Sequence, residues 1–165
     1  MAETAAEAQA VITAVRTHHA AMADTLARRT EAVVAASDPK ERAAALGALV
    51  AYWRGEVLVH AAAEESTIYA ATAPLAPALV TALELEHRSL GTQVDALEAA
   101  AAAPAPPAGL PVALAAAAAL GVFRVHADKE NDVVLPLLAE AGRPLRPLLG
   151  DMERAFAAGL AAGGA

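Results

Sequence analysis

Apolar residues recur along most of the chain at intervals of three and four, the spacing of one face of an α-helix. The clearest example is the seam formed by Val80, Leu83, His87, Leu90, Val94 and Leu97. His87 stands in this seam at a position where the spacing favours a leucine. The segment therefore predicts an amphipathic helix that turns one imidazole toward the core.

Proline, glycine and capping residues divide the chain into four long helices and a short fifth, expected at about 4–36, 39–71, 78–102, 111–141 and 145–160. Asp38 is placed to cap the second helix, with Pro39 at its first position and Glu41 completing a capping box. Pro136 is expected to kink the last turns of the fourth helix. Short connections between long amphipathic helices predict an all-α fold, an up-and-down antiparallel four-helix bundle with a short C-terminal fifth helix.

The fifth helix carries a single apolar stripe, formed by Leu145, Leu148, Met152, Phe156 and Leu160. We expect residues 1–142 to form the bundle and residues 143–165 to form this amphipathic helix. The stripe would either cover the bundle or contact a second subunit, which would make the protein a homodimer.

Two further helices repeat the pattern of an inward histidine and add a carboxylate to it. His60 shares a stripe with Glu64, and His126 shares one with Glu130. In both pairs the glutamate follows the histidine by four residues, so that imidazole and carboxylate lie on the same helix face.

The first helix offers two neighbouring histidines, His18 and His19, of which only one can point squarely inward. At about 100° per residue, the apolar residues of this helix centre roughly 40° from His19 and roughly 60° from His18. The spacing favours His19 and leaves His18 as the alternative.

Composition narrows the class of protein. The formal net charge of −7 argues against a nucleic-acid partner, and the absence of cysteine excludes disulfides, thiolate metal sites and cysteine catalysis. The N-terminal sequence MAETAAEAQA lacks the basic and apolar segments of a signal peptide. The apolar run at residues 109–123 is mostly alanine and ends at Arg124, which favours a soluble helix over a membrane span. We expect a soluble, cytoplasmic protein without a membrane partner.

Four inward histidines and two glutamates would be costly in an apolar core unless something satisfies them. A single buried histidine is usually an ordinary core residue, but one on each of four helices indicates a metal site. Six such ligands suit a pair of first-row transition metals, with iron preferred because mixed nitrogen and oxygen ligands permit redox cycling; manganese and zinc accept the same ligand types. The Glu-x-x-His spacing of ferritin-like dimetal bundles occurs only once among these helices, at Glu84 and His87.

The reversed order, histidine before glutamate, resembles that of hemerythrin-like proteins with the HHE cation-binding domain. The resemblance rests on THHAAM, LVHAAAEESTIY, LEHRSL and FRVHADKENDVVLP, in this order. It implies a non-haem centre of two iron ions, of the Fe–O–Fe type. The implied ligands are His19 or His18, His60, Glu64, His87, His126 and Glu130, with Glu64 and Glu130 bridging. Glu65 is the next candidate ligand, and its alternative interpretation is a solvated neighbour of Glu64.

Two positions depart from the oxygen-carrying members of that family. Gly91 stands where they have a second histidine, and Asn131 stands where they have an aspartate, with Glu130 one residue earlier. These differences argue against simple reversible oxygen carriage, and Gly91 would leave room for a small ligand near His87. Tyr69, nine residues after His60, falls on nearly the opposite helix face and is expected to be a packing or boundary residue, or to approach the site if the helix unwinds there.

The resemblance implies two classes of function. One is a redox-active di-iron protein that binds dioxygen, peroxide or nitric oxide, with catalase-like or peroxidase-like turnover. The other is a non-catalytic module that senses iron or oxygen, in which metal occupancy controls folding and partner contacts. No pair of groups outside the ligand set stands out as general acid and base, so the sequence leaves enzymatic activity open.

Overall fold

The computed structural model describes residues 3–103 and 109–163, and every regular element in these ranges is helical. The α-helices are α1 (Ala5–Ala35), α2 (Pro39–Tyr52), α3 (Leu58–Glu64), α4 (Ala70–Thr72), α5 (Pro77–Ala101), α6 (Gly109–Lys129), α7 (Leu135–Glu140) and α8 (Leu145–Gly163). Three π-helical turns join several of them, η1 (Trp53–Val57), η2 (Glu65–Tyr69) and η3 (Glu130–Val134). The second and fourth expected helices therefore exist as α2–α4 and α6–α7, each interrupted by π turns.

Capping residues begin the helices at the expected places. Thr4 and Glu7 form a reciprocal capping box at the start of α1, and the Asp38 side chain accepts from the backbone of Lys40 and Glu41 at the start of α2. The expected capping box at Asp38 is only half formed. The Glu41 carboxylate instead accepts from the Ser37 backbone N–H at 3.4 Å, one residue further from the helix.

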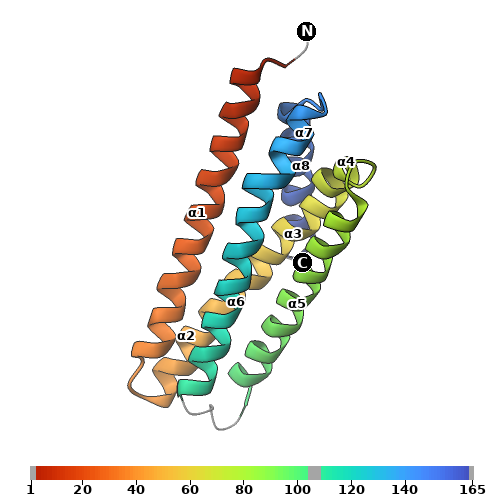
Figure 1. The fold of residues 1–165 in the computed structure, drawn as a ribbon. Coiled ribbons are helices and arrows are strands. Elements are labelled where there is room, and N and C mark those ends of the chain that lie inside the picture. Colours follow the sequence, from red (N-terminus) through yellow and green to blue (C-terminus); the bar gives the residue numbers. More distant parts are fainter. Residues whose placement is uncertain (1–2, 104–108, 164–165) are drawn as a thin grey trace.

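The long helices lie lengthwise beside one another (Figure 1). Helix α1 packs against α2 and α6, and α5 packs against the same two helices. The first turns of α1 lie toward one end of the molecule, as do the helices α4 and α7. The connection between α1 and α2 lies at the other end (Figure 1). The proline-rich linker expected at 104–111 falls mainly on residues 104–108, outside the described residues.

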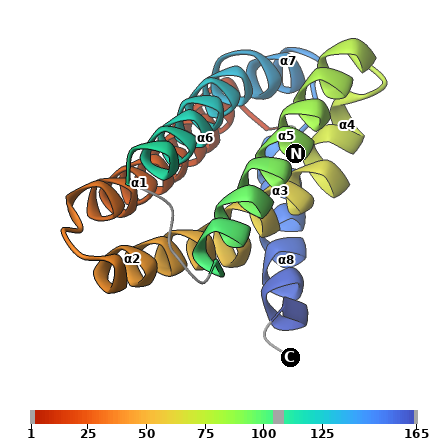
Figure 2. The ribbon, with the colours of Figure 1, turned by 90° about the horizontal axis from the view of Figure 1, so that it is seen from below.

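Helix α8 leaves the direction of the other helices and crosses the molecule on its α3 side (Figure 2). It contacts α3 and η2 and also touches α1 and α7. Leu145 and Met152 of its apolar stripe are buried by these contacts, Leu148 and Phe156 are partly buried, and Leu160 is 38% exposed.

Two apolar clusters form the core. One contains Leu26, Trp53 and Phe123, and the other contains Leu83, Leu138 and Met152. On each long helix a histidine separates residues of the first cluster from residues of the second. The fold thus places one polar layer between two apolar layers.

The segment Leu110–Glu140 is long and apolar enough to cross a membrane by length and composition alone. In this fold α1 and α5 pack against its helix α6, and it carries the buried His126 and Glu130. Its apolar character is accounted for in part by this packing.

The π turn η3 ends two residues before Pro136, at which a kink is expected. The Leu135 N–H donates to the Glu130 carbonyl, five residues back, and Pro136 has no N–H to continue the ladder. A π turn inside an α-helix shifts the face on which later residues lie.

Candidate metal centre

Six side chains from four helical segments converge between the two apolar clusters. His19 comes from α1, His60 and Glu64 from α3, His87 from α5, His126 from α6 and Glu130 from the start of η3. All six are buried, with exposures of 2–7%. They are the residues that the inward seams and the family resemblance singled out.

The histidines form two pairs. In the first, the Nε2 atoms of His19 and His60 lie 3.1 Å apart, and His60 Nε2 lies 2.8 Å from Glu64 Oε1. In the second, the Nε2 atoms of His87 and His126 lie 2.9 Å apart. Each pair therefore aims its ring nitrogens at a common point.

The two glutamates span the space between the pairs. Glu64 directs Oε1 to the first pair and Oε2 to His87, at 3.6 Å. Glu130 directs Oε1 to His126, at 3.4 Å, and Oε2 to His19, at 3.7 Å. Each carboxylate thus offers one oxygen to each histidine pair.

The donor set fits metal cations by its chemistry. Glu64, His87, His126 and Glu130 form one group with ligand atoms within 4.8 Å of one another, and His19, His60 and Glu64 form a second. Nitrogen and oxygen donors of this kind suit iron, manganese and zinc. The buried cluster is therefore able to hold metal.

Three of the imidazoles are oriented through their second ring nitrogen. His19 Nδ1 lies 3.2 Å from Asn131 Oδ1, His87 Nδ1 lies 2.9 Å from Glu65 Oε1, and His126 Nδ1 lies 3.0 Å from Glu86 Oε2. Such contacts fix the tautomer that leaves Nε2 free to bind a metal.

Glu86 was missed by sequence reasoning, although it stands directly before His87 in LEHRSL. Its carboxylate crosses to α6, where it also pairs with Lys129. Burial favours a raised pKa for the Glu86 carboxyl, but Lys129 and His126 together lower it below the usual range. The signal in the sequence was the position of Glu86 directly before the inward His87. That position does not show which neighbouring helix the Glu86 side chain faces.

His18 and Glu65, the less certain candidate ligands, lie at the edge of the cluster. His18 is exposed, and its ring centroid lies 5.1 Å from that of His60. The part of its ring that is shielded from water, together with the nearby His60 and His19, lowers the pKa of His18. The Glu65 side chain is 43% exposed and reaches the outer nitrogen of His87. The geometry places His19, and not His18, in the cluster.

Tyr69 lies inside the site, although in a regular α-helix it would lie on nearly the opposite face from His60. Its hydroxyl donates to Glu130 Oε1 at 2.6 Å and lies 3.1 Å from His126 Nε2. The π turn η2 causes this difference, because residues five apart in a π-helix, such as Glu64 and Tyr69, lie on nearly the same face. Burial and the nearby Glu130 raise the pKa of the Tyr69 hydroxyl far above its usual value, so it remains a donor.

Opposite charges within the cluster stabilise one another. Burial favours a lower pKa for His126, but the Glu130 carboxylate raises it to about 9. Burial has the same effect on His60, where Glu64 outweighs it and raises the pKa. Burial tends to raise the pKa of Glu64, but His60 and His19 hold it well below the usual range.

Two cavities lie on the α8 side of the cluster. The inner cavity, of about 20 Å³, is bordered by His19, Glu64 and Glu130 and otherwise by apolar side chains. The outer cavity, of about 210 Å³, lies between α1 and α8 and reaches His18 and His60.

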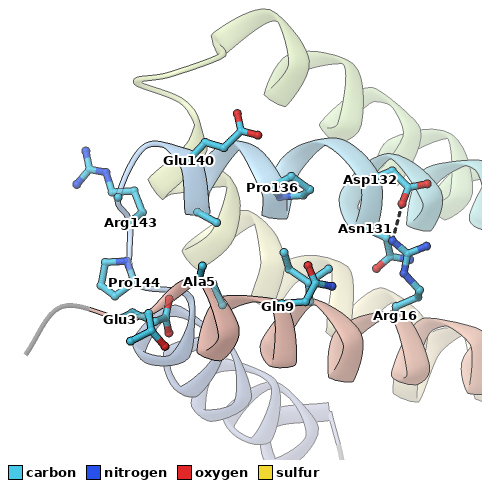
Figure 3. Close-up of a pocket in the computed structure, with 15 residues that line it drawn as sticks. Glu3, Ala5, Gln9, Arg16, Asn131, Asp132, Pro136, Glu140, Arg143 and Pro144 are labelled. Carbon is cyan, nitrogen blue, oxygen red and sulfur yellow. Dashed lines mark hydrogen bonds and ion pairs between the residues drawn. The ribbon is translucent and has the colours of Figure 1, made fainter.

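A larger surface groove, of about 760 Å³, lies between the first turns of α1 and the η3–α7 segment (Figure 3). Arg16 and Asp132 form an ion pair of 2.6 Å at one end of it. Asn131 is the lining residue that reaches the cluster, through its contact with His19. The groove shares no lining residue with the two α8 cavities.

The model of one protein family, the hemerythrin HHE cation binding domain, matches residues 10–138. This range contains all six cluster residues and ends before α8. Neither a curated protein nor a solved structure matches the chain.

Proposed function

Because the chain belongs to the hemerythrin HHE cation-binding family, we propose that its buried cluster holds two iron ions and binds dioxygen, peroxide or nitric oxide. The observation that carries the proposal is the orientation of the two glutamates, which offer one oxygen to each histidine pair. The four long helical segments then form an up-and-down antiparallel bundle around the ions.

Each residue of the cluster has a distinct role in this proposal. His19 and His60 would hold one ion, and His87 and His126 would hold the other. Glu64 and Glu130 would supply a carboxylate oxygen to each ion. Four imidazoles and two carboxylates support a change of oxidation state, which favours iron or manganese over zinc, and iron is the proposed metal. When bound, the metals supply Lewis-acid polarisation of a small ligand and exchange electrons with it.

The rest of the chain prepares the site for such a ligand. Asn131, Glu65 and Glu86 hold three imidazoles in the orientation that points Nε2 inward. Tyr69 donates to Glu130 and keeps a proton close to the centre. The two apolar clusters exclude bulk water above and below the polar layer. This arrangement is compatible with catalase-like or peroxidase-like turnover.

A sensing module is the second candidate function, and one observation favours it. The cluster joins residues of α1, α3, α5 and α6 at one buried point. Loss of metal would leave carboxylates and imidazoles facing one another there, so that metal occupancy would alter the stability of the whole molecule. Oxygen release from added peroxide detects catalase-like turnover, and peroxide-dependent oxidation of an added reducing dye detects peroxidase-like turnover. A sensing module shows neither.

Metal analysis of protein purified without added metals tests the site itself. We expect about two iron ions per chain, as in other dimetal bundles, and absorption in the near ultraviolet from an oxo-bridged pair. His126→Ala should abolish metal loading, whereas His18→Ala, at the exposed edge, should leave it intact. Full iron content in His126→Ala would show that the assigned ligand set is wrong.

A further inference from the structure

We propose that small neutral molecules enter the centre between α1 and α8, across an apolar wall formed by Val15, Leu149 and Met152, and that this wall excludes anions. The inference rests on the proposed function and narrows its ligand class to uncharged molecules of diatomic size, such as dioxygen and nitric oxide. Helix α8, which supplies two of the three wall residues, lies outside the range matched by the family model.

The outer cavity provides the entrance. It is lined by His60 on its inner side, by Phe156 of α8, and by His18 and Glu153, both of which are exposed at its mouth. The Phe156 ring lies edge-on to the His60 ring, with centroids 6.2 Å apart. A molecule in this cavity is therefore already next to one of the proposed ligands.

The inner cavity provides the destination. His19, Glu64 and Glu130 border it on the side of the cluster, and Leu145, Leu149 and Met152 border it on the side of α8. Val15, Leu149 and Met152 line both cavities, which makes them the wall between the outer and the inner cavity. Met152 is 6% exposed, whereas Val15 and Leu149 are partly buried, so Met152 is the most deeply buried residue of the wall.

Size and polarity set the selectivity. The inner cavity of about 20 Å³ is close to the space that one water-sized molecule needs. An anion would have to lose its hydration to cross the apolar wall, where no polar side chain replaces that hydration. The Glu153 carboxylate at the mouth and the net charge of −7 repel anions further. A neutral diatomic molecule has little hydration to lose.

The wall is held in place at both ends of α8. The Glu3 carboxylate accepts from the backbone N–H groups of Leu145 and Arg146, at 2.6 and 2.9 Å, and so fixes the start of the helix. Near the other end Gly159 lies so close to α3 that an added Cβ would stand 2.7 Å from Val59 Cγ1. The wall residues between these two points have little freedom to move apart.

A competing route would pass Gly91 on α5. A Cβ on Gly91 would meet no heavy atom within 4 Å among the described residues, so there is space one turn from His87. Filling that space with Gly91→Leu blocks the competing route and leaves α8 untouched. The two routes can therefore be distinguished by substitution.

The test uses the metal-loaded protein and two probes, nitric oxide for the reduced form and azide for the oxidised form. Leu149→Phe narrows the entrance and should lower the association rate of nitric oxide by about tenfold, which corresponds to about 1.4 kcal/mol on the barrier to entry. Met152→Ala opens the wall and should raise the association rate of azide by a similar factor of about ten. Leu148→Ala is the matched control, because Leu148 lies on the same helix but lines neither cavity.

Unchanged rates in both wall variants would overturn the proposal, as would a loss of nitric oxide binding in Gly91→Leu as large as that in Leu149→Phe. Metal content is measured for every variant, and equal loading assigns the rate changes to entry.

Xenon binding to the metal-free protein, followed by ¹²⁹Xe NMR, gives a second readout, because xenon occupies apolar cavities. Leu149→Phe should weaken it, and Leu148→Ala should not. If the wild-type chain bound xenon in this way but held no metal, the proposed function would be contradicted and the entry path would stand.

Discussion

At the level of single residues, the Nδ1 atoms of His19, His87 and His126 contact side chains outside the six-residue cluster. His126 is held by Glu86, whose carboxylate is itself held by Lys129 on the same helix as His126. This chain of charged contacts joins α5 to α6 beside the cluster. Partners of this kind orient the imidazole that binds a metal and so affect metal affinity.

Glu86→Ala should weaken metal binding by about 10–100-fold, because His126 loses the contact that fixes its tautomer. Glu86→Gln should have a smaller effect, since its amide oxygen can still accept a hydrogen bond. Metal affinity is measured by competition with a chelator of known strength. Glu84→Ala is the matched control on α5, where the described residues make no hydrogen bond to Glu84, and equal losses in both alanine variants would refute the assignment.

At the level of elements, helix α8 depends on a close approach to α3. Val59 and Gly159 meet where no room exists for another methyl group. Gly150, on the same helix, has ordinary space, with Arg154 Nη1 as its nearest neighbour at 3.6 Å. The close packing of α8 on α3 therefore requires a glycine at position 159 but not at position 150.

Gly159→Ala should lower the free energy of unfolding by about 1–3 kcal/mol, because the added methyl group overpacks the contact with Val59. Gly150→Ala should raise it by about 0.5–1 kcal/mol, because alanine favours the helix more than glycine does. Urea unfolding measures the free energy of unfolding of both variants. Adding Val59→Ala to Gly159→Ala should restore the stability that Gly159→Ala alone loses. If Gly159→Ala were as stable as Gly150→Ala, α8 would not pack as described.

At the level of the whole molecule, protons and metal ions compete for the same buried groups. In the metal-free protein the pKa of His126 is raised to about 9 from an ordinary 6.5, and that of His60 is raised as well. The stability that these imidazolium groups contribute is fully present below pH 6.5 and is lost as the pH rises through about 9. Glu64 behaves in the opposite way, and its contribution is lost as the pH falls through its lowered pKa.

Chelator-treated protein should therefore lose stability between pH 6.5 and about 9, by up to about 3 kcal/mol from His126. Metal affinity should increase over the same range, because neutral imidazole is the form that binds a metal. Urea unfolding of the chelated and the loaded protein at several pH values measures both slopes. Parallel slopes would show that the histidines do not exchange protons for metal.

The sequence by itself determined the approximate extent of the five helical segments and the inward position of His60, Glu64, His87, His126 and Glu130, but not the π turns within two of these segments. These features follow from periodicity along a single helix, because residues four apart share a face whatever the helix packs against. The caps at Thr4 and Asp38 are local for the same reason. The family match over residues 10–138 agrees with the resemblance that these motifs indicated.

Only the tertiary structure decided which groups meet between helices. Tyr69 lies in the cluster because the π turn η2 shifts it to the helix face that carries Glu64. The periodicity of apolar residues does not predict such a turn. The contact of Glu86 with His126 and the place of Met152 between the two cavities depend on how helices are rotated and offset against one another. Those quantities are set by the packing of side chains distant in sequence, which the spacing of residues along one helix does not encode.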